Sequence, residues 1–165
     1  MIAFINKYVR AAKASLLYSR ALDRASESDH AEALAQLNSV YEAFRTEMPS
    51  RDVPYDVNIL CGHVAAQLGK YDIAVEAITI ALEQLQREKI KGLSEHDRKY
   101  LKYYCAVEMR YCASKMGPGA VSKELLASAP EFYSLQIGKV KPYIRRNFPI
   151  DRPDAFNHAY FSGSN

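Results

Sequence analysis

Residues 58–82 read NILCGHVAAQLGKYDIAVEAITIAL, and this stretch decides the fold. Its apolar side chains recur at steps of three and four residues, which is the spacing of one face of an α-helix. The first stripe is Ile59, Leu60, Val64 and Leu68, and the second is Ala74, Ile78, Ala81 and Leu82, which continues to Leu85 just beyond the stretch. Between them stands Gly69, a residue type that commonly ends helices. The stretch therefore predicts two helices joined by a short turn, the first starting near Pro54 and the second at Tyr71.

Small residues stand where these two helices would face each other. Gly62 and Ala65 belong to the first helix, and Ala74 belongs to the second. Two helices approach closely only where the side chains at their crossing are small, because larger side chains hold the axes apart. We therefore predict that Gly62 and Ala74 form the crossing.

With these features, the segment 55–88 resembles a tetratricopeptide repeat, a helix–turn–helix unit of ~34 residues. The resemblance places Gly69 in the turn and Tyr71 as the aromatic residue beside it. It is incomplete at Asn58, where the family usually has an aromatic residue, and no proline closes the repeat after Leu85.

A weaker copy lies upstream at an offset of 41 residues. The offset aligns Ala21 with Gly62, Ala33 with Ala74, and Leu37 with Ile78. The extra length relative to the usual repeat falls in the Pro49–Pro54 loop. Because such repeats bury their faces by stacking, a terminal cap is expected, and Pro130–Phe148 is the candidate.

The remaining sequence is also helical in its spacing. Predicted helices run from Ile5 to about Ala25, from a cap at Asp29 through Phe44, from a cap at Ser94 to Gly117, over Ser122–Ser128, and from Pro130 to about Arg146. Pro142 would kink or divide the last of these helices. The expected fold class is all-α: antiparallel helix–turn–helix repeats in a right-handed solenoid with a C-terminal capping helix. One domain is expected over 1–165. It contains a degenerate repeat at 5–48, the best repeat at 54–88 and, at 94–117, a helix that resembles the first helix of a third repeat. Capping helices follow at 120–148, and an irregular tail at 149–165.

Composition limits the class of protein. The chain has 165 residues, 48% of them hydrophobic, which suits one compact domain. The net charge is +3, and the excess lies in residues 111–165, which hold seven basic and four acidic side chains. Nucleic-acid binding usually needs a denser basic surface. Three cysteines cannot all pair with one another, and the first residues do not resemble a signal peptide, so a cytoplasmic location is expected.

The sequence carries no recognisable catalytic or metal motif. Cys61 and His63 are two residues apart, so they would point to different faces of a helix. Cys105 and Cys112 share a face, but tetrahedral zinc would need two further ligands, and no second paired-ligand spacing exists. We therefore expect buried thiols, no metal, no cofactor and no enzymatic activity.

Tyrosine is the unusual aromatic residue here, with 12 copies and no tryptophan in the chain. Tyr100, Tyr104 and Tyr111 follow helical spacing, so they are expected to form a buried stripe. The alternative is that part of this stripe lines a groove, since tyrosine is enriched at interfaces.

The family resemblance implies a binding surface, because the first helix of each repeat lines a concave groove. The implied partner-binding residues are Tyr18 and Leu22 from the first repeat, and Asp56, Ile59, His63 and Gln67 from the central one. The resemblance thus implies a protein-interaction module that binds a peptide or a partner protein. A second copy of the chain is also a candidate partner. The length and repeat number resemble those of bacterial type III secretion chaperones, so a chaperone or adaptor is one expected use.

Two alternatives stay open. One is an immunity protein that neutralises a bacterial toxin. The other is nucleic-acid binding through a basic C-terminal face formed by Lys139, Lys141, Arg145, Arg146 and Arg152. A steep dependence of affinity on salt would distinguish the second alternative.

Overall fold

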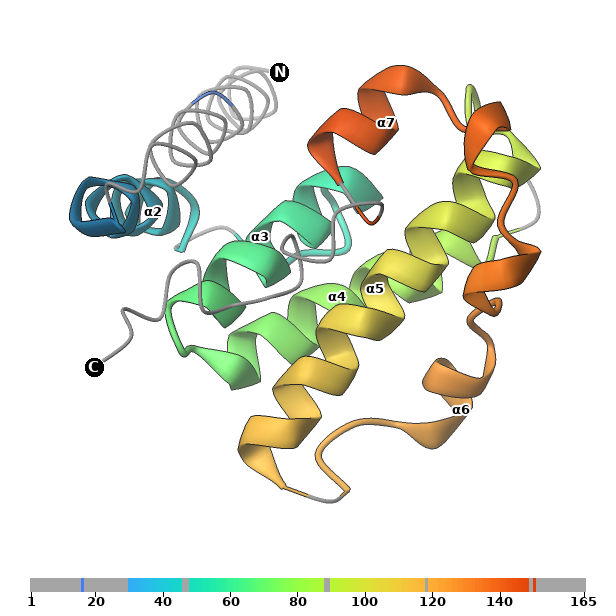
Figure 1. Ribbon diagram of the computed structural model, residues 1–165. Coiled ribbons are helices and arrows are strands. Elements are labelled where there is room, and N and C mark those ends of the chain that lie inside the picture. Colours follow the sequence, from blue (N-terminus) through green and yellow to red (C-terminus); the bar gives the residue numbers. More distant parts are fainter. Residues whose placement is uncertain are drawn as a thin grey trace.

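The computed structural model describes residues 16, 30–45, 48–87, 90–117, 119–148 and 150. These residues form α-helices, short 3-10 turns and loops, with no strand among them (Figure 1). The elements are α2 (His30–Phe44), α3 (Tyr55–Gln67), α4 (Tyr71–Leu85), α5 (Glu95–Met116), α6 (Lys123–Ala127), η1 (Phe132–Ser134), η2 (Ile137–Lys139) and α7 (Pro142–Asn147). The all-α prediction is thus confirmed for this part of the chain. The helix predicted at 5–25 lies outside it, apart from Leu16, which is helical and exposed.

Helices α3 and α4 form the predicted hairpin. Gly69 adopts a φ of 71° between them, and the amides of Gly69 and Lys70 donate to the carbonyl oxygens of Ala66 and Ala65 at 3.1 and 2.8 Å. This is the hydrogen-bond pattern with which a left-handed glycine closes a helix. The chain therefore reverses within a few residues, and α4 packs along α3 (Figure 1).

The crossing of α3 and α4 lies at Gly62, as predicted. A Cβ atom added there would lie 2.6 Å from the side chain of Ile78 and 3.2 Å from the carbonyl oxygen of Ala74. Ala65 and Ala74 are fully buried beside it. The small residues thus let the two backbones approach more closely than larger side chains would allow.

Helix α5 begins at the predicted cap and ends at the predicted stop. The Ser94 hydroxyl accepts from the Asp97 amide at 3.1 Å, and the Asp97 carboxylate accepts from the Ser94 amide at 3.1 Å. This reciprocal pair satisfies two donors at the helix start. Gly117 follows the last turn with a φ of 104°. The helix packs against both α3 and α4.

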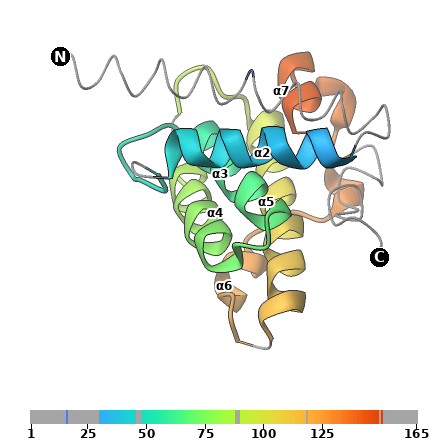
Figure 2. The same ribbon diagram turned by 90° about the vertical axis from the view of Figure 1, so that its left-hand side faces the viewer.

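Helix α2 lies across α3 on the side away from α5 (Figures 1 and 2). Leu37, Val40 and Tyr41 are its buried contacts, as their spacing predicts. The loop between α2 and α3 is held from inside by two amides. The Asn58 amide donates to the Ser50 carbonyl oxygen at 2.8 Å, and the Gln84 amide donates to the Val53 carbonyl oxygen at 2.7 Å.

The C-terminal region differs from the prediction. A single helix from Pro130 to about Arg146 is wrong: η1 and η2 occupy its first part, and α7 begins at Pro142. The residue before a proline avoids helical angles, and Lys141 is accordingly extended, with a ψ of 135°. Pro142 thus starts a helix instead of bending one, because its fixed φ suits the first helical position.

The buried side chains form two clusters. The first lies between α2 and the α3–α4 hairpin. The second lies between α3, α4, α5 and the C-terminal region, where Val140, Ile144, Phe148 and Ile150 enter the core. Helices α3 and α4 contribute to both clusters. Among the described helices, none combines the length and apolar character that crossing a membrane requires.

Candidate functional site

The predicted partner-binding residues do not lie together on an open surface. Tyr18 and Leu22 fall outside the described residues. Asp56 is exposed in the first turn of α3, where its carboxylate accepts from the Val57 amide at 3.0 Å. Ile59 and His63 are buried.

Gln67 is buried as well. The expectation of an open groove at Ile59, His63 and Gln67 is therefore corrected. The physical reason is that α3 is covered on every side, and each residue of the segment 58–67 is buried. Helix α2, helix α4, helix α5 and the C-terminal region each cover part of it.

His63 belongs to a buried polar cluster between α3 and α5. Its Nδ1 lies 2.5 Å from a carboxylate oxygen of Glu108 and 3.0 Å from the Tyr104 hydroxyl. The side chains of His63 and Glu108 are 4% and 0% exposed. A buried carboxylate needs such a compensating group, because removal from water strongly disfavours an unpaired charge. The cluster therefore joins two helices across the core.

The sequence motifs considered above do not include Glu108, although the sequence contains a signal for it. It stands one helical turn after Tyr104 and one turn before Cys112, so it interrupts an otherwise apolar stripe of α5. A single charge in a buried stripe indicates a partner on a facing helix. The sequence does not show which partner that is, since the α3–α5 register depends on the whole fold.

The cysteines are buried thiols, as predicted. Burial raises the pKa of Cys61 and of Cys112 to about 12, and it also raises the pKa of Cys105. The Glu108 charge adds to the effect at Cys105 and Cys112, because a nearby anion disfavours a thiolate. At neutral pH all three are protonated and weakly nucleophilic. Within the described ranges, no three His, Cys, Asp or Glu side chains are grouped so as to hold a metal ion.

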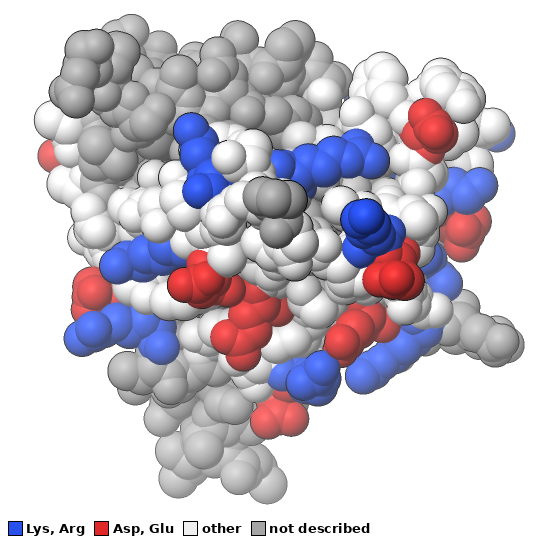
Figure 3. Space-filling model, turned by 90° about the horizontal axis from the view of Figure 1, so that it is seen from below, with Lys and Arg blue, Asp and Glu red and all other residues white. Residues whose placement is uncertain are grey.

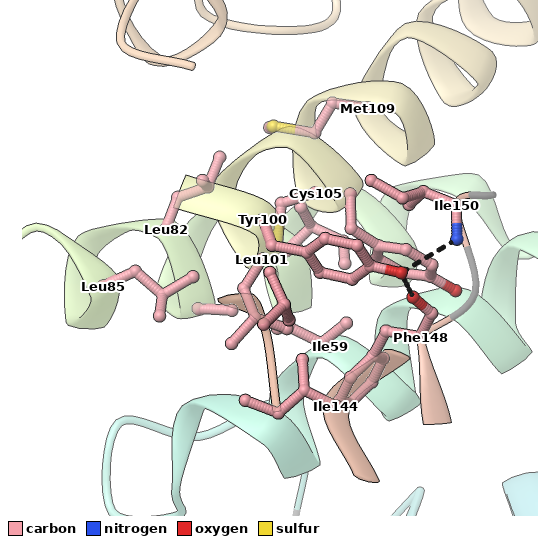
Figure 4. Packing of buried hydrophobic residues seen from close by; sticks show 14 of the residues in the cluster. Ile59, Leu82, Leu85, Tyr100, Leu101, Cys105, Met109, Ile144, Phe148 and Ile150 are labelled. Carbon is pink, nitrogen blue, oxygen red and sulfur yellow. Dashed lines mark hydrogen bonds between the residues drawn. The ribbon is translucent and has the colours of Figure 1, made fainter. Parts of the chain in front are cut away.

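The predicted tyrosine stripe divides into two roles. Tyr100 and Tyr104 are buried as expected, whereas Tyr111 is half-buried and packs edge-on against Tyr71 with ring centroids 6.0 Å apart. Tyr100 also has a polar role. Its hydroxyl donates to the Phe148 carbonyl oxygen at 2.7 Å and accepts from the Ile150 amide at 3.1 Å (Figure 4). We call residues 140–148 together with Ile150 the C-terminal strap.

A second polar contact holds the other end of the C-terminal strap. The Asp97 carboxylate accepts from the Lys141 amide at 2.9 Å, and the Lys141 amine lies 3.5 Å from the same carboxylate and donates to the Gly92 carbonyl oxygen. Burial opposes ionisation of Asp97, but hydrogen bonds from Lys141 and Ser94 outweigh it and lower the pKa of the carboxyl group. Asp97 thus caps α5 and anchors the strap at once.

Among the described residues of the C-terminal region, three large aromatic side chains are exposed. Phe132 is 48%, Tyr133 is 85% and Tyr143 is 49% exposed. Phe132 packs on Tyr103 of α5 with ring centroids 5.5 Å apart. Leu135 and Ile137, which follow Phe132 and Tyr133 in the chain, pack against the second cluster and hold this segment on the core.

The basic residues of this region are partly engaged. Lys141 is paired with Asp97, Lys139 and Arg146 are exposed, and Arg152 lies outside the described residues. Figure 3 views the molecule from below in Figure 1, the side opposite α7, and there Lys and Arg side chains are interspersed with Asp and Glu side chains. That face therefore has mixed charge.

Comparisons of the chain with protein families, with characterised proteins and with solved structures found no match.

Proposed function

We propose that this chain is a protein-binding helical domain, and that it binds its partner through the exposed aromatic side chains of the C-terminal region. The supporting observation is the pair Phe132 and Tyr133 on η1. Exposed apolar surface of this kind usually marks an interaction site. The exposure is a property of the fold, because Leu135 and Ile137 anchor the same segment in the core.

The size and chemistry of these aromatic side chains favour a protein partner. An aromatic side chain can bury ~150–250 Å² in an interface, and tyrosine adds a hydroxyl that tolerates both water and contact. Hot-spot residues of this type commonly contribute about 2 kcal/mol or more to binding. Tyr133, at 85% exposure, has most of its surface left to bury.

The arrangement of repeats belongs to the same proposal. We infer that the α3–α4 hairpin is a tetratricopeptide-like unit and that α5 is the first helix of a following unit. The close approach at Gly62 and the turn at Gly69 support this inference. In such an array α3 and α5 would line the concave side. The proposed use is a bacterial secretion chaperone or adaptor, with an immunity protein against a bacterial toxin as the alternative.

The test is comparative capture from the native host followed by titration. Wild-type chain, a Phe132→Ala/Tyr133→Ala variant and a Ser134→Ala control on the same turn are each used as bait. A protein retained by the wild type and the control but lost by the double variant supports the proposal. Its identity separates a secreted substrate from a toxin. Equal retention by all three baits contradicts the aromatic surface.

Nucleic-acid binding through Arg145 and Arg146 is tested in parallel. Phosphate contacts would make affinity fall steeply as salt increases, and Arg145→Glu/Arg146→Glu would abolish binding. Under the protein-binding proposal the wild type has no salt-sensitive affinity for single-stranded RNA or DNA. The arginine variant then retains the captured protein partner.

A further inference from the structure

The C-terminal strap covers the face that α3 and α5 form together. Four of its apolar side chains are buried: Val140, Ile144, Phe148 and Ile150. They pack in the second cluster, to which Ile59 of α3 and Tyr104 of α5 also belong. The rings of Phe148 and Tyr104 meet edge-on, with centroids 5.5 Å apart. This face would otherwise be an apolar groove.

The other side of the strap faces water. Pro142, Tyr143, Arg146 and Asn147 are exposed, so no other described element covers α7. Helix α7 has six residues, and helices this short are not stable alone in water. The strap therefore keeps its structure only while it packs on α3 and α5. In turn, it shields the apolar side chains of those helices from water.

Polar contacts hold the strap at two separate points. Asp97 binds the backbone and amine of Lys141 near one end, and the Tyr100 hydroxyl bridges Phe148 and Ile150 at the other (Figure 4). Both anchors are side chains of α5, one turn apart on the same helix. Backbone groups of the strap are thus bound as those of a docked peptide are, by side chains of the receptor surface.

The connection to the rest of the chain allows the strap to leave. Between the end of α5 at Met116 and the start of the strap lie α6, η1 and η2, which are short and mostly exposed elements. Opening would not require α3, α4 or α5 to separate, because their mutual contacts do not pass through the strap.

We propose that the C-terminal strap is a releasable internal occupant of a peptide-binding site between α3 and α5. The site takes an amphipathic segment with apolar side chains four residues apart, matching Val140, Ile144 and Phe148, and a basic residue beside the first. A partner segment of this kind would replace the strap. The inference rests on the proposed protein-binding function but concerns a different surface from Phe132 and Tyr133.

Hydrogen exchange on the full wild-type chain tests release. The amides of Lys141, Phe148 and Ile150 are hydrogen-bonded and should exchange through a local opening, well before the central amides of α3 and α4. If the strap amides exchange only together with those of α3 and α4, the strap is an inseparable part of the core and the proposal is wrong.

A second experiment tests the site itself. A labelled synthetic peptide of residues 139–150, KVKPYIRRNFPI, is titrated into the full chain by fluorescence anisotropy. Tyr100→Phe removes both hydroxyl contacts of the strap, and Tyr103→Phe is the control on the same helix. Lys141→Met weakens the strap from its own side and leaves the receptor groove unchanged.

The peptide must compete with the internal strap, so its apparent affinity reports the open fraction. We expect Lys141→Met to bind it roughly tenfold more tightly than wild type or Tyr103→Phe, because the variant loses the contacts of the Lys141 amine with Asp97 and with the Gly92 carbonyl oxygen. Tyr100→Phe loses its hydroxyl contacts to the strap and also to the added peptide, so its apparent affinity for the peptide should increase less. A peptide with alanine at positions 144 and 148 should not bind.

Two results would overturn the site: no peptide binding by folded Lys141→Met, or equal binding by wild type and Lys141→Met. If Tyr100→Phe fails to fold, the Lys141→Met comparison still decides. Neither result touches the Phe132/Tyr133 proposal, whose variants are measured with the captured partner.

Discussion

Among single residues, Glu108 has the most demanding environment. It is fully buried, and its carboxylate lies 2.5 Å from His63 Nδ1. Removing one member of a buried pair leaves the other without compensation, which typically costs about 3–5 kcal/mol. A surface pair of similar geometry, Arg51 and Glu83 at 2.7 Å, should cost less than about 1 kcal/mol because water and salt screen it.

This contrast gives the first prediction. Glu108→Ala should lower the free energy of unfolding by about 3 kcal/mol or more, and Glu83→Ala by less than about 1 kcal/mol. Urea denaturation of both single variants, of His63→Ala and of the His63→Ala/Glu108→Ala double variant measures the coupling. A double variant whose loss equals the sum of the single losses would show that the pair contributes no interaction energy.

The buried thiols give a prediction in pH. Cys61 and Cys112 have pKa values of about 12 in the folded chain, against an ordinary value of 9.0. Unfolded thiols therefore lose protons at lower pH than folded ones. The contribution of these groups to stability is complete below about pH 9 and falls as pH rises toward 12.

The measurement is a denaturation series from pH 7 to pH 11 together with thiol titration by a chromogenic disulfide reagent. At pH 8 the folded chain should react slowly, and the chain in denaturant should show three rapid thiols. Cys112→Ala is the control, because it removes one thiol. Replacement by serine is unsuitable, since it would add a buried hydroxyl group. Rapid reaction in the folded state would mean that the thiols are accessible.

At the scale of elements, the crossing of α3 and α4 is the most specific contact. Gly62→Ala would place a methyl group 2.6 Å from the Ile78 side chain, which must then move. Overpacking of this kind commonly costs about 1–3 kcal/mol, and Gly62→Leu should exceed Gly62→Ala. Thermal and urea unfolding check both values.

Two matched variants make this prediction decisive. Gly138 has no atom within 4 Å of an added Cβ, so Gly138→Ala should change stability little. The added Cβ would lie 2.6 Å from both Cδ1 and Cγ1 of Ile78. Ile78→Val removes Cδ1 and keeps Cγ1, so in the Gly62→Ala background it should recover only part of the loss. A Gly62→Leu chain as stable as wild type would contradict the crossing.

Elements with strong local signals could be predicted from the sequence. Gly69 specifies the C-terminal end of α3 within a residue or two, and the Ser94–Asp97 capping box does the same for the start of α5. The helix predicted over 130–146 failed because side-chain spacing cannot distinguish a helix from a chain of turns that also directs Leu135, Ile137 and Val140 inward. Only Pro142 marked the true boundary.

The candidate site was harder to predict than the helices. The tetratricopeptide resemblance implies an open groove at Ile59, and helical periodicity cannot correct it because periodicity describes one helix at a time. It does not show what covers the face from a distant part of the chain. The covering side chains, Ile144 and Phe148, are more than 80 residues away in sequence. The same limit hid the pairing of His63 with Glu108.

For the whole molecule, the division of the core into two clusters has a thermodynamic consequence. Leu37 is buried in the first cluster and Ile144 in the second, and α3 and α4 contribute side chains to both. Helix α5 also contributes to both, through Cys112 in the first cluster, and these shared helices should make the body unfold as one unit. Val75 packs against both clusters, but Leu37 and Ile144 belong to different clusters, so substitutions at these two positions should be close to additive.

The last prediction follows from this arrangement. Leu37→Ala should cost about 2–5 kcal/mol, the range for removal of a buried leucine side chain. Ile144→Ala should cost no more than the free energy of opening the C-terminal strap, because an open strap no longer uses that side chain. The double variant should lose the sum of the two within about 0.5 kcal/mol. Urea unfolding followed by far-UV and by tyrosine near-UV circular dichroism should give coincident curves for wild type. Two separated transitions, or a double variant far from additive, would show that α3 and α4 do not join the two clusters into one cooperative unit.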